Sequence, residues 1–139
     1  MIVLDTNVLS ELMRISPAPQ VMRWMRQYDG SIFSTSSTVA AELLYRVERF
    51  PKGERRDVLL FAVQAMLNQE LKGRILPFDY DAAQRYALLT AERRRRGAPI
   101  NQPDAQIAAV AQAHGAKLAT RNTSDFAHCG IDVINPWTA

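Results

Sequence analysis

Met1-Ile2-Val3-Leu4-Asp5-Thr6-Asn7 is the segment that decides the fold, because an apolar run ends abruptly in a carboxylate. The apolar residues predict a buried β-strand at 2–5, followed by a short helix at about 7–13. In an open parallel sheet, ligands bind beyond the carboxyl ends of the strands, which is where Asp5 would stand. A carboxylate has little structural use there unless it caps the following helix.

The rest of the chain alternates between the two kinds of regular structure. Further strands are expected at 31–34, 74–78, 117–120 and 132–134. Further helices are expected at about 19–28, 38–49, 54–72, 80–96 and 102–114, with a short helical turn near 123–127. This alternation implies βαβ crossovers and a mainly parallel sheet covered on both faces. We therefore predict a single domain over 1–139, an α/β protein built as a three-layer α/β/α sandwich with about five strands.

The composition is that of an ordinary globular protein, with 47% hydrophobic and 22% charged residues among 139. No apolar run approaches the roughly 20 residues of a membrane span, and no signal peptide is evident, so we expect no membrane association. The single cysteine, Cys129, excludes an internal disulfide and indicates a reducing, cytoplasmic setting. The net charge of +3 is compatible with a polyanionic partner.

Four acidic residues follow predicted strands or begin predicted helices: Asp5, Glu42, Asp104 and Asp125. The topology places all four at the same rim of the sheet, where their charges would repel one another without a cation. Carboxylate oxygens suit Mg²⁺ or Mn²⁺, and such ions activate water for phosphate chemistry. The only soft or borderline ligands, Cys129, His114 and His128, do not form a zinc spacing.

Each acid also has a purely structural interpretation. Asp104 can complete a capping box with Asn101, Glu42 can oppose the dipole of its helix, and Asp125 can cap a turn. These readings explain each residue separately. The joint placement of the four acids favours a metal site.

Four segments in order resemble the PIN-domain ribonucleases, and among them the VapC-type toxins of bacterial toxin–antitoxin pairs. They are Ile2-Val3-Leu4-Asp5-Thr6-Asn7-Val8-Leu9, Ser36-Ser37-Thr38-Val39-Ala40-Ala41-Glu42-Leu43, Pro103-Asp104-Ala105-Gln106-Ile107-Ala108-Ala109 and Leu118-Ala119-Thr120-Arg121-Asn122-Thr123-Ser124-Asp125-Phe126. The resemblance covers the whole chain. The segments 75–79 and 134–137 are most similar to the FitB-like subgroup.

The resemblance implies a Mg²⁺- or Mn²⁺-dependent endoribonuclease that hydrolyses RNA with a metal-activated water. It further implies a homodimer, with helices 54–72 and 80–96 as the expected contacts. A cognate antitoxin protein would inhibit the enzyme and can carry it into a larger assembly on DNA.

Residue by residue, Asp5, Glu42 and Asp104 match the acidic triad of the family, with Asp5 and Asp104 expected to hold the metal. Many relatives carry the fourth acid where this chain has Asn122, and others carry it three residues later, at Asp125. We favour Asp125, with Asn122 as a hydrogen-bonding neighbour. The remaining supporting polar residues at this rim are Thr6, Asn7 and Thr120.

Two other classes of function use similar α/β domains. A non-cleaving PIN-like module that binds RNA or protein is the alternative, although a polyanion binder gains nothing from a bare acidic pocket. A receiver-like domain with an aspartate nucleophile is disfavoured, because Asp5 is followed by Thr6 and Asn7 and because Lys117 begins its strand. The sequence leaves the RNA substrate open.

The densest charge run is Arg93-Arg94-Arg95-Arg96. It can bind the RNA backbone, since each phosphate contact adds salt-dependent affinity. It can equally be a solvated group of cations at a helix C-terminus, where the dipole favours positive charge. A second basic group lies around the turn near residues 49–55.

Overall fold

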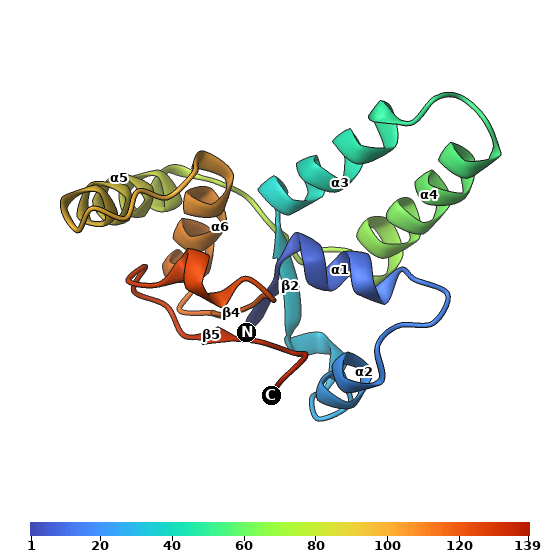
Figure 1. Ribbon diagram of the computed structural model, residues 1–139, viewed down its shortest axis with the longest axis horizontal. Helices are drawn as coiled ribbons and strands as arrows, with labels where there is room; N and C mark the ends of the chain where they lie inside the picture. The colour runs from blue at the N-terminus through green and yellow to red at the C-terminus, as the bar shows by residue number, and fades with distance from the viewer.

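The computed structural model describes residues 1–139 and contains one sheet of five parallel strands in the order β3-β2-β1-β4-β5 (Figure 1). The strands are β1 (Ile2–Leu4), β2 (Phe33–Ser36), β3 (Ile75–Leu76), β4 (Lys117–Ala119) and β5 (Val133–Ile134). The helices are α1 (Thr6–Leu12), α2 (Pro19–Met25), α3 (Ser37–Arg49), α4 (Glu54–Ala65), α5 (Tyr80–Arg95) and α6 (Gln102–Ala113). Two short 3-10 helices, η1 (Gly30–Ile32) and η3 (Thr123–Phe126), and one π-helical turn, η2 (Met66–Glu70), complete the elements.

The strand order confirms the predicted three-layer sandwich. Connections between parallel strands are right-handed, and the chain moves in opposite directions across the sheet before and after β3. The helices that follow β1 and β2 therefore lie on one face, and α5 and α6 lie on the other. Figure 1 shows α1 and α6 on opposite sides of the strands.

The switch in direction places a binding crevice at the centre of the sheet. β1 pairs with β2 on one side and with β4 on the other. The connections on these two sides of β1 therefore run over opposite faces of the sheet. Open α/β sheets bind ligands at such a point, beyond the carboxyl ends of the strands. The pairing continues past β1, because the N–H of Asp5 donates to the carbonyl of Ala119 at 3.0 Å.

β1 and α6 contribute much of the core at the site end of the fold, although every layer takes part in it. All of β1 is buried, and residues 107–111 of α6 are fully buried as well. Three of those five positions are alanine, so their small side chains let α6 pack closely against α5 and the sheet. Burial of each larger aliphatic side chain contributes about 1.5–3 kcal/mol. The first turn of α6 is consequently fixed relative to the crevice.

Two element predictions were wrong in detail. Residues 30–32 form η1 because the side chain of Asp29 accepts the N–H of Ser31 at 2.9 Å, so β2 starts at Phe33. β2 then runs to Ser36, whose hydroxyl caps α3 by accepting the N–H of Val39 at 3.2 Å. The helix expected over 54–72 changes at Met66 into a π-helical turn, in which the N–H of Leu71 donates to the carbonyl of Met66.

The remaining elements agree with the prediction to within a few residues. Asp79 caps α5, and Asn101 caps α6 as the capping-box spacing indicates. None of the helices combines the length and the apolar character that crossing a membrane requires.

Candidate active site

Asp5 stands at the carboxyl end of β1 and is 5% exposed. Its Oδ1 accepts the N–H of Thr6 at 2.8 Å, so the residue also caps α1. Its Oδ2 accepts the hydroxyl of Thr120 at 2.7 Å and the side-chain amide of Asn7 at 3.3 Å. Donors from two elements thus fix the direction of this carboxylate.

The predicted supporting residues form one hydrogen-bond network that joins α1 to the end of β4. The amide of Asn7 also donates to Thr120 Oγ1 at 3.2 Å, and Asn7 Oδ1 accepts the N–H of Arg121 at 3.0 Å. Asn122 takes part through its main chain, since its N–H donates to Thr120 Oγ1 at 3.1 Å and its carbonyl accepts from the N–H of Asp125.

Glu42 lies in the second turn of α3 and faces the start of α1. Its Oε2 accepts the hydroxyl of Thr6 at 2.8 Å. Thr6 is the residue that follows Asp5, so this hydrogen bond connects Glu42 to the same crevice. The other carboxylate oxygen of Glu42, Oε1, remains available to a ligand.

Asp104 lies in the first turn of α6 and has both a capping contact and a place at the site. Its N–H donates to Asn101 Oδ1 at 2.8 Å, and its Oδ2 accepts the side-chain amide of Asn101 at 3.0 Å. The helix cap therefore uses the main chain of Asp104. The carboxylate is oriented by Asn101 and keeps an oxygen that the cap does not use.

The electrostatics show that the four acids lie close together. Burial raises the pKa of Asp5, Glu42 and Asp104. Repulsion adds to this effect, because the charges of Asp5 and Asp104 raise the pKa of Glu42. The charge of Asp125 likewise raises the pKa of Asp5 and of Asp104. The structure thus brings together all four acids that the sequence singles out.

No basic side chain pairs with these four carboxylates. The ion pairs of the molecule use other acids, namely Glu11, Glu48, Asp81 and Glu92. The charge of Arg46 offsets only part of the rise in the pKa of Glu42. The charge of Arg93 likewise offsets only part of the rise in the pKa of Asp104. The site therefore concentrates negative charge that the protein itself does not neutralise.

This charge predicts an unusual pH dependence of stability. With EDTA present, we expect the free energy of unfolding to increase as the pH falls from about 7 to about 5. A carboxyl with a raised folded-state pKa binds its proton before the same group does in the unfolded chain, so acid favours folding. The gain accumulates as the pH falls through the raised values and is complete below the ordinary carboxyl pKa of about 4.

Urea unfolding at the two pH values measures this effect. The triple variant Asp5→Asn/Glu42→Gln/Asp104→Asn should lose the gain, whereas Glu48→Gln, which removes an exposed acid of α3, should retain it. Equal pH profiles in the triple variant and the unmodified protein would contradict the assignment of the raised pKa values to these acids.

The donor set fits a hard divalent cation. All four groups offer carboxylate oxygens, which Mg²⁺ and Mn²⁺ prefer. No three side chains of His, Cys, Asp or Glu are arranged so that they could hold one ion directly. Magnesium commonly takes one or two protein carboxylates and fills its other positions with water. The set therefore suits an ion bound in that way.

The four arginines predicted to bind RNA differ in their exposure. Arg94, Arg95 and Arg96 are exposed, and the last two pair with Glu92. Arg93 is 6% exposed, and its guanidinium faces main-chain carbonyls inside the protein. Contact with RNA is therefore excluded for Arg93 and stays a prediction for the other three.

The helical period of α5 indicates that Arg93 is buried, although the run of four arginines suggests an exposed group. On α5 the buried positions are Ala82, Leu89 and Arg93, which lie on one face at spacings of seven and four residues. Arg93 thus continues the apolar stripe, and the period alone places it on the inner side of the helix.

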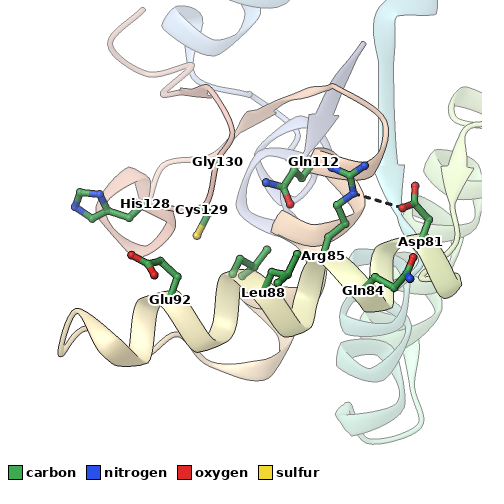
Figure 2. A pocket seen from close by; sticks show the side chains of 10 residues that line it. Asp81, Gln84, Arg85, Leu88, Glu92, Gln112, His128, Cys129 and Gly130 are labelled. Atoms are coloured by element: carbon green, nitrogen blue, oxygen red, sulfur yellow. Dashed lines mark hydrogen bonds and ion pairs between the residues drawn. The ribbon is translucent and has the colours of Figure 1, made fainter.

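The larger hollows of the molecule do not coincide with the acids. One, of about 560 Å³, lies between α5 and residues 128–130, where Figure 2 shows Arg85, Glu92, Gln112 and Cys129 around it. An apolar groove, also of about 560 Å³, lies between α2, β2 and η2.

The sequence matches the family model described as PIN domain over residues 2–131, which include all four acids. The chain is 42% identical over 137 residues to VapC ribonuclease Y4jK of Sinorhizobium fredii, covering 99% of this chain and 98% of that protein. The crystal structure of FitAcB from Neisseria gonorrhoeae is similar, with a TM-score of 0.91, 34% identity and full coverage of both chains. A structure of FitAB bound to an IR36 DNA fragment gives a TM-score of 0.90 at 34% identity, covering 99% of this chain and 96% of that one.

Proposed function

This chain belongs to the PIN domain family, and on that premise we propose that it is a metal-dependent endoribonuclease toxin of a toxin–antitoxin pair. The observation that carries the proposal is the convergence of four carboxylates without a basic partner. Support also comes from the relatives, which include a protein named as a VapC ribonuclease. RNA contains the phosphodiester bond on which such a site acts.

In the proposed mechanism, Asp5 and Asp104 hold Mg²⁺ or Mn²⁺. The bound ion supplies Lewis-acid chemistry, since it polarises a phosphoryl oxygen and lowers the pKa of water. Thr120 and Asn7 keep the Asp5 carboxylate in one direction, and Asn101 does the same for Asp104. These contacts preserve the spacing of the two acids before substrate arrives.

Glu42 and Asp125 complete the site. Burial raises the pKa of Glu42, so this carboxylate is suited to accept the proton of the attacking water. Its Oε2 is engaged by Thr6, which leaves Oε1 to face that water. Asp125 orients ligands from the η3 side of the crevice. No side chain acts as a covalent nucleophile in this scheme.

Removal of the metal tests the proposal. We expect cleavage of a single-stranded RNA to fall at least about 100-fold in EDTA, because the attacking water and the departing oxygen both lose their charge stabilisation. Addition of excess Mn²⁺ should restore cleavage. The control is Mn²⁺ binding by calorimetry, which should be lost in Asp5→Asn/Asp104→Asn. Cleavage that persists in EDTA would refute a metal-dependent nuclease.

The alternative, a PIN-like module that binds RNA without cleaving it, makes the opposite prediction. Such a module would retain RNA at low salt and yield no product at any Mn²⁺ concentration. The unpaired acidic charge argues against it, because the charge repels a phosphate backbone unless a cation is bound.

We further propose that a cognate antitoxin protein is the partner of this chain. The structures similar to it include a FitAB complex bound to DNA, which supports an assembly of toxin, antitoxin and DNA. Four large apolar side chains are exposed on the packed helices α3 and α4 and supply a surface for this partner: Leu44, Tyr45, Val58 and Phe61. The homodimer stays a prediction. We also propose that the activity is cytoplasmic, which the nucleic-acid partners support.

A further inference from the structure

A buried arginine lies behind the acidic rim without a carboxylate partner. Arg93 is 6% exposed and takes part in none of the ion pairs of the molecule. A buried cation is costly unless its donors are satisfied, so the groups that satisfy it matter. Here they are all oxygen or sulfur atoms of two loops.

The guanidinium of Arg93 donates mainly to main-chain carbonyls. Its Nε donates to the carbonyl of Ala98 at 2.6 Å. One terminal nitrogen donates to the carbonyls of Asp125 at 2.8 Å and of Ala127 at 3.1 Å, and it lies 3.6 Å from the sulfur of Cys129. Three of these four contacts therefore fall on the segment that carries the fourth acid.

That segment has little regular structure of its own. η3 is a single 3-10 turn of 4 residues, and β5, which follows it, contains 2. His128 adopts a left-handed conformation with φ of 58°, which interrupts any local ladder. The side chain of Phe126 is buried and anchors one side of Asp125. Arg93 supplies the contact that fixes the carbonyl of Asp125 itself.

Resting on the proposed nuclease function, we infer that Arg93 is a positioning residue that holds Asp125 at the acidic site. Its planar fork of donors reaches carbonyls in two loops at once, which the point charge of a lysine cannot reproduce. Arg93 also lies close enough to Asp104 for its charge to oppose the larger effect of burial, which raises the pKa of that acid. The arginine thus acts on both acids, on Asp104 through its charge and on Asp125 through the main-chain carbonyl.

A double-mutant cycle tests the inference. We expect Arg93→Lys to lower kcat about 10- to 100-fold with little change in KM, because a small displacement of a reacting group has this effect. In an Asp125→Asn background the same change should have no further effect, since the group through which Arg93 acts is already lost. Arg85→Lys, on the same helix and with a side chain 42% exposed, is the matched control and should cleave like the unmodified protein.

Three results would overturn the inference and leave the nuclease function intact. The first is full activity of Arg93→Lys, and the second is full activity of Asp125→Asn. The third is a double variant, Arg93→Lys/Asp125→Asn, whose loss in kcat equals the product of the two single losses. By contrast, an unmodified protein that does not cleave RNA in Mn²⁺ would refute the nuclease function itself.

A second readout is independent of metal and activity. Hydrogen–deuterium exchange in EDTA should rise in residues 123–130 of Arg93→Lys and stay unchanged in the rest of the chain. Arg85→Lys should show no rise. If Arg93→Lys and the second variant Arg93→Gln both fail to fold by circular dichroism, the arginine has a general structural role and the inference is wrong.

Discussion

Asp5→Asn is expected to reduce RNA cleavage by at least about 100-fold, the range found when a group that stabilises the transition state is removed. Asp5 is at the centre of the sheet, and its charge influences both Glu42 and Asp104. An amide is nearly isosteric with the carboxylate but has no charge with which to hold a cation. The rate constant kcat in saturating Mn²⁺ measures the loss.

The same substitution should not weaken the fold. Burial raises the pKa of Asp5, so the charged carboxylate disfavours the folded state at neutral pH. Loss of this charge offsets loss of the acceptor that Oδ2 provides to Thr120 and Asn7, so the free energy of unfolding of Asp5→Asn in EDTA should stay close to that of the unmodified protein. A variant that is inactive because it is unfolded would contradict this prediction, and Glu48→Gln serves as the control for loss of one negative charge.

Asp104→Asn is expected to abolish cleavage to a similar degree, at least about 100-fold, while preserving α6. The cap of this helix uses the N–H of Asp104, which the substitution keeps. The side-chain oxygen of the new asparagine can still accept the amide of Asn101. What is lost is the charge that the metal requires, so urea unfolding should be nearly unchanged.

Asn101→Ala should give the opposite pattern. Loss of the side chain that accepts the N–H of Asp104 removes the helix cap, which contributes about 1 kcal/mol. Cleavage should fall less than in Asp104→Asn, because the carboxylate remains. If Asp104→Asn weakened the fold as much as Asn101→Ala and still cleaved RNA, the capping interpretation of Asp104 would be the correct one.

The convergence of the acids was predictable because it depends on topology. Alternating strands and helices place the carboxyl ends of all parallel strands at one rim, so Asp5, Glu42 and Asp104 had to approach one another. The cap at Asn101 was predictable for a different reason, since Asn101 and Asp104 have the spacing of a capping box. These features need no knowledge of side-chain packing.

The details that were missed depend on contacts between distant segments. The extent of β2 depends on a turn capped by Asp29 and on its pairing with β3, which residues 31–34 alone do not reveal. Arg93 was grouped with its exposed neighbours because it lies in a run of charge, whereas its partners in the 125–129 segment lie more than thirty positions away. The same is true of the contact between Thr6 and Glu42, which are 36 positions apart.

The hydrogen bond between Thr120 and Asp5 joins residues 115 positions apart. β1 lies beside β4 in the finished sheet, so the Asp5 carboxylate lacks this hydroxyl donor until Thr120 has been synthesised and β4 has joined the sheet. The acidic site can therefore be completed only after translation has passed the fourth strand.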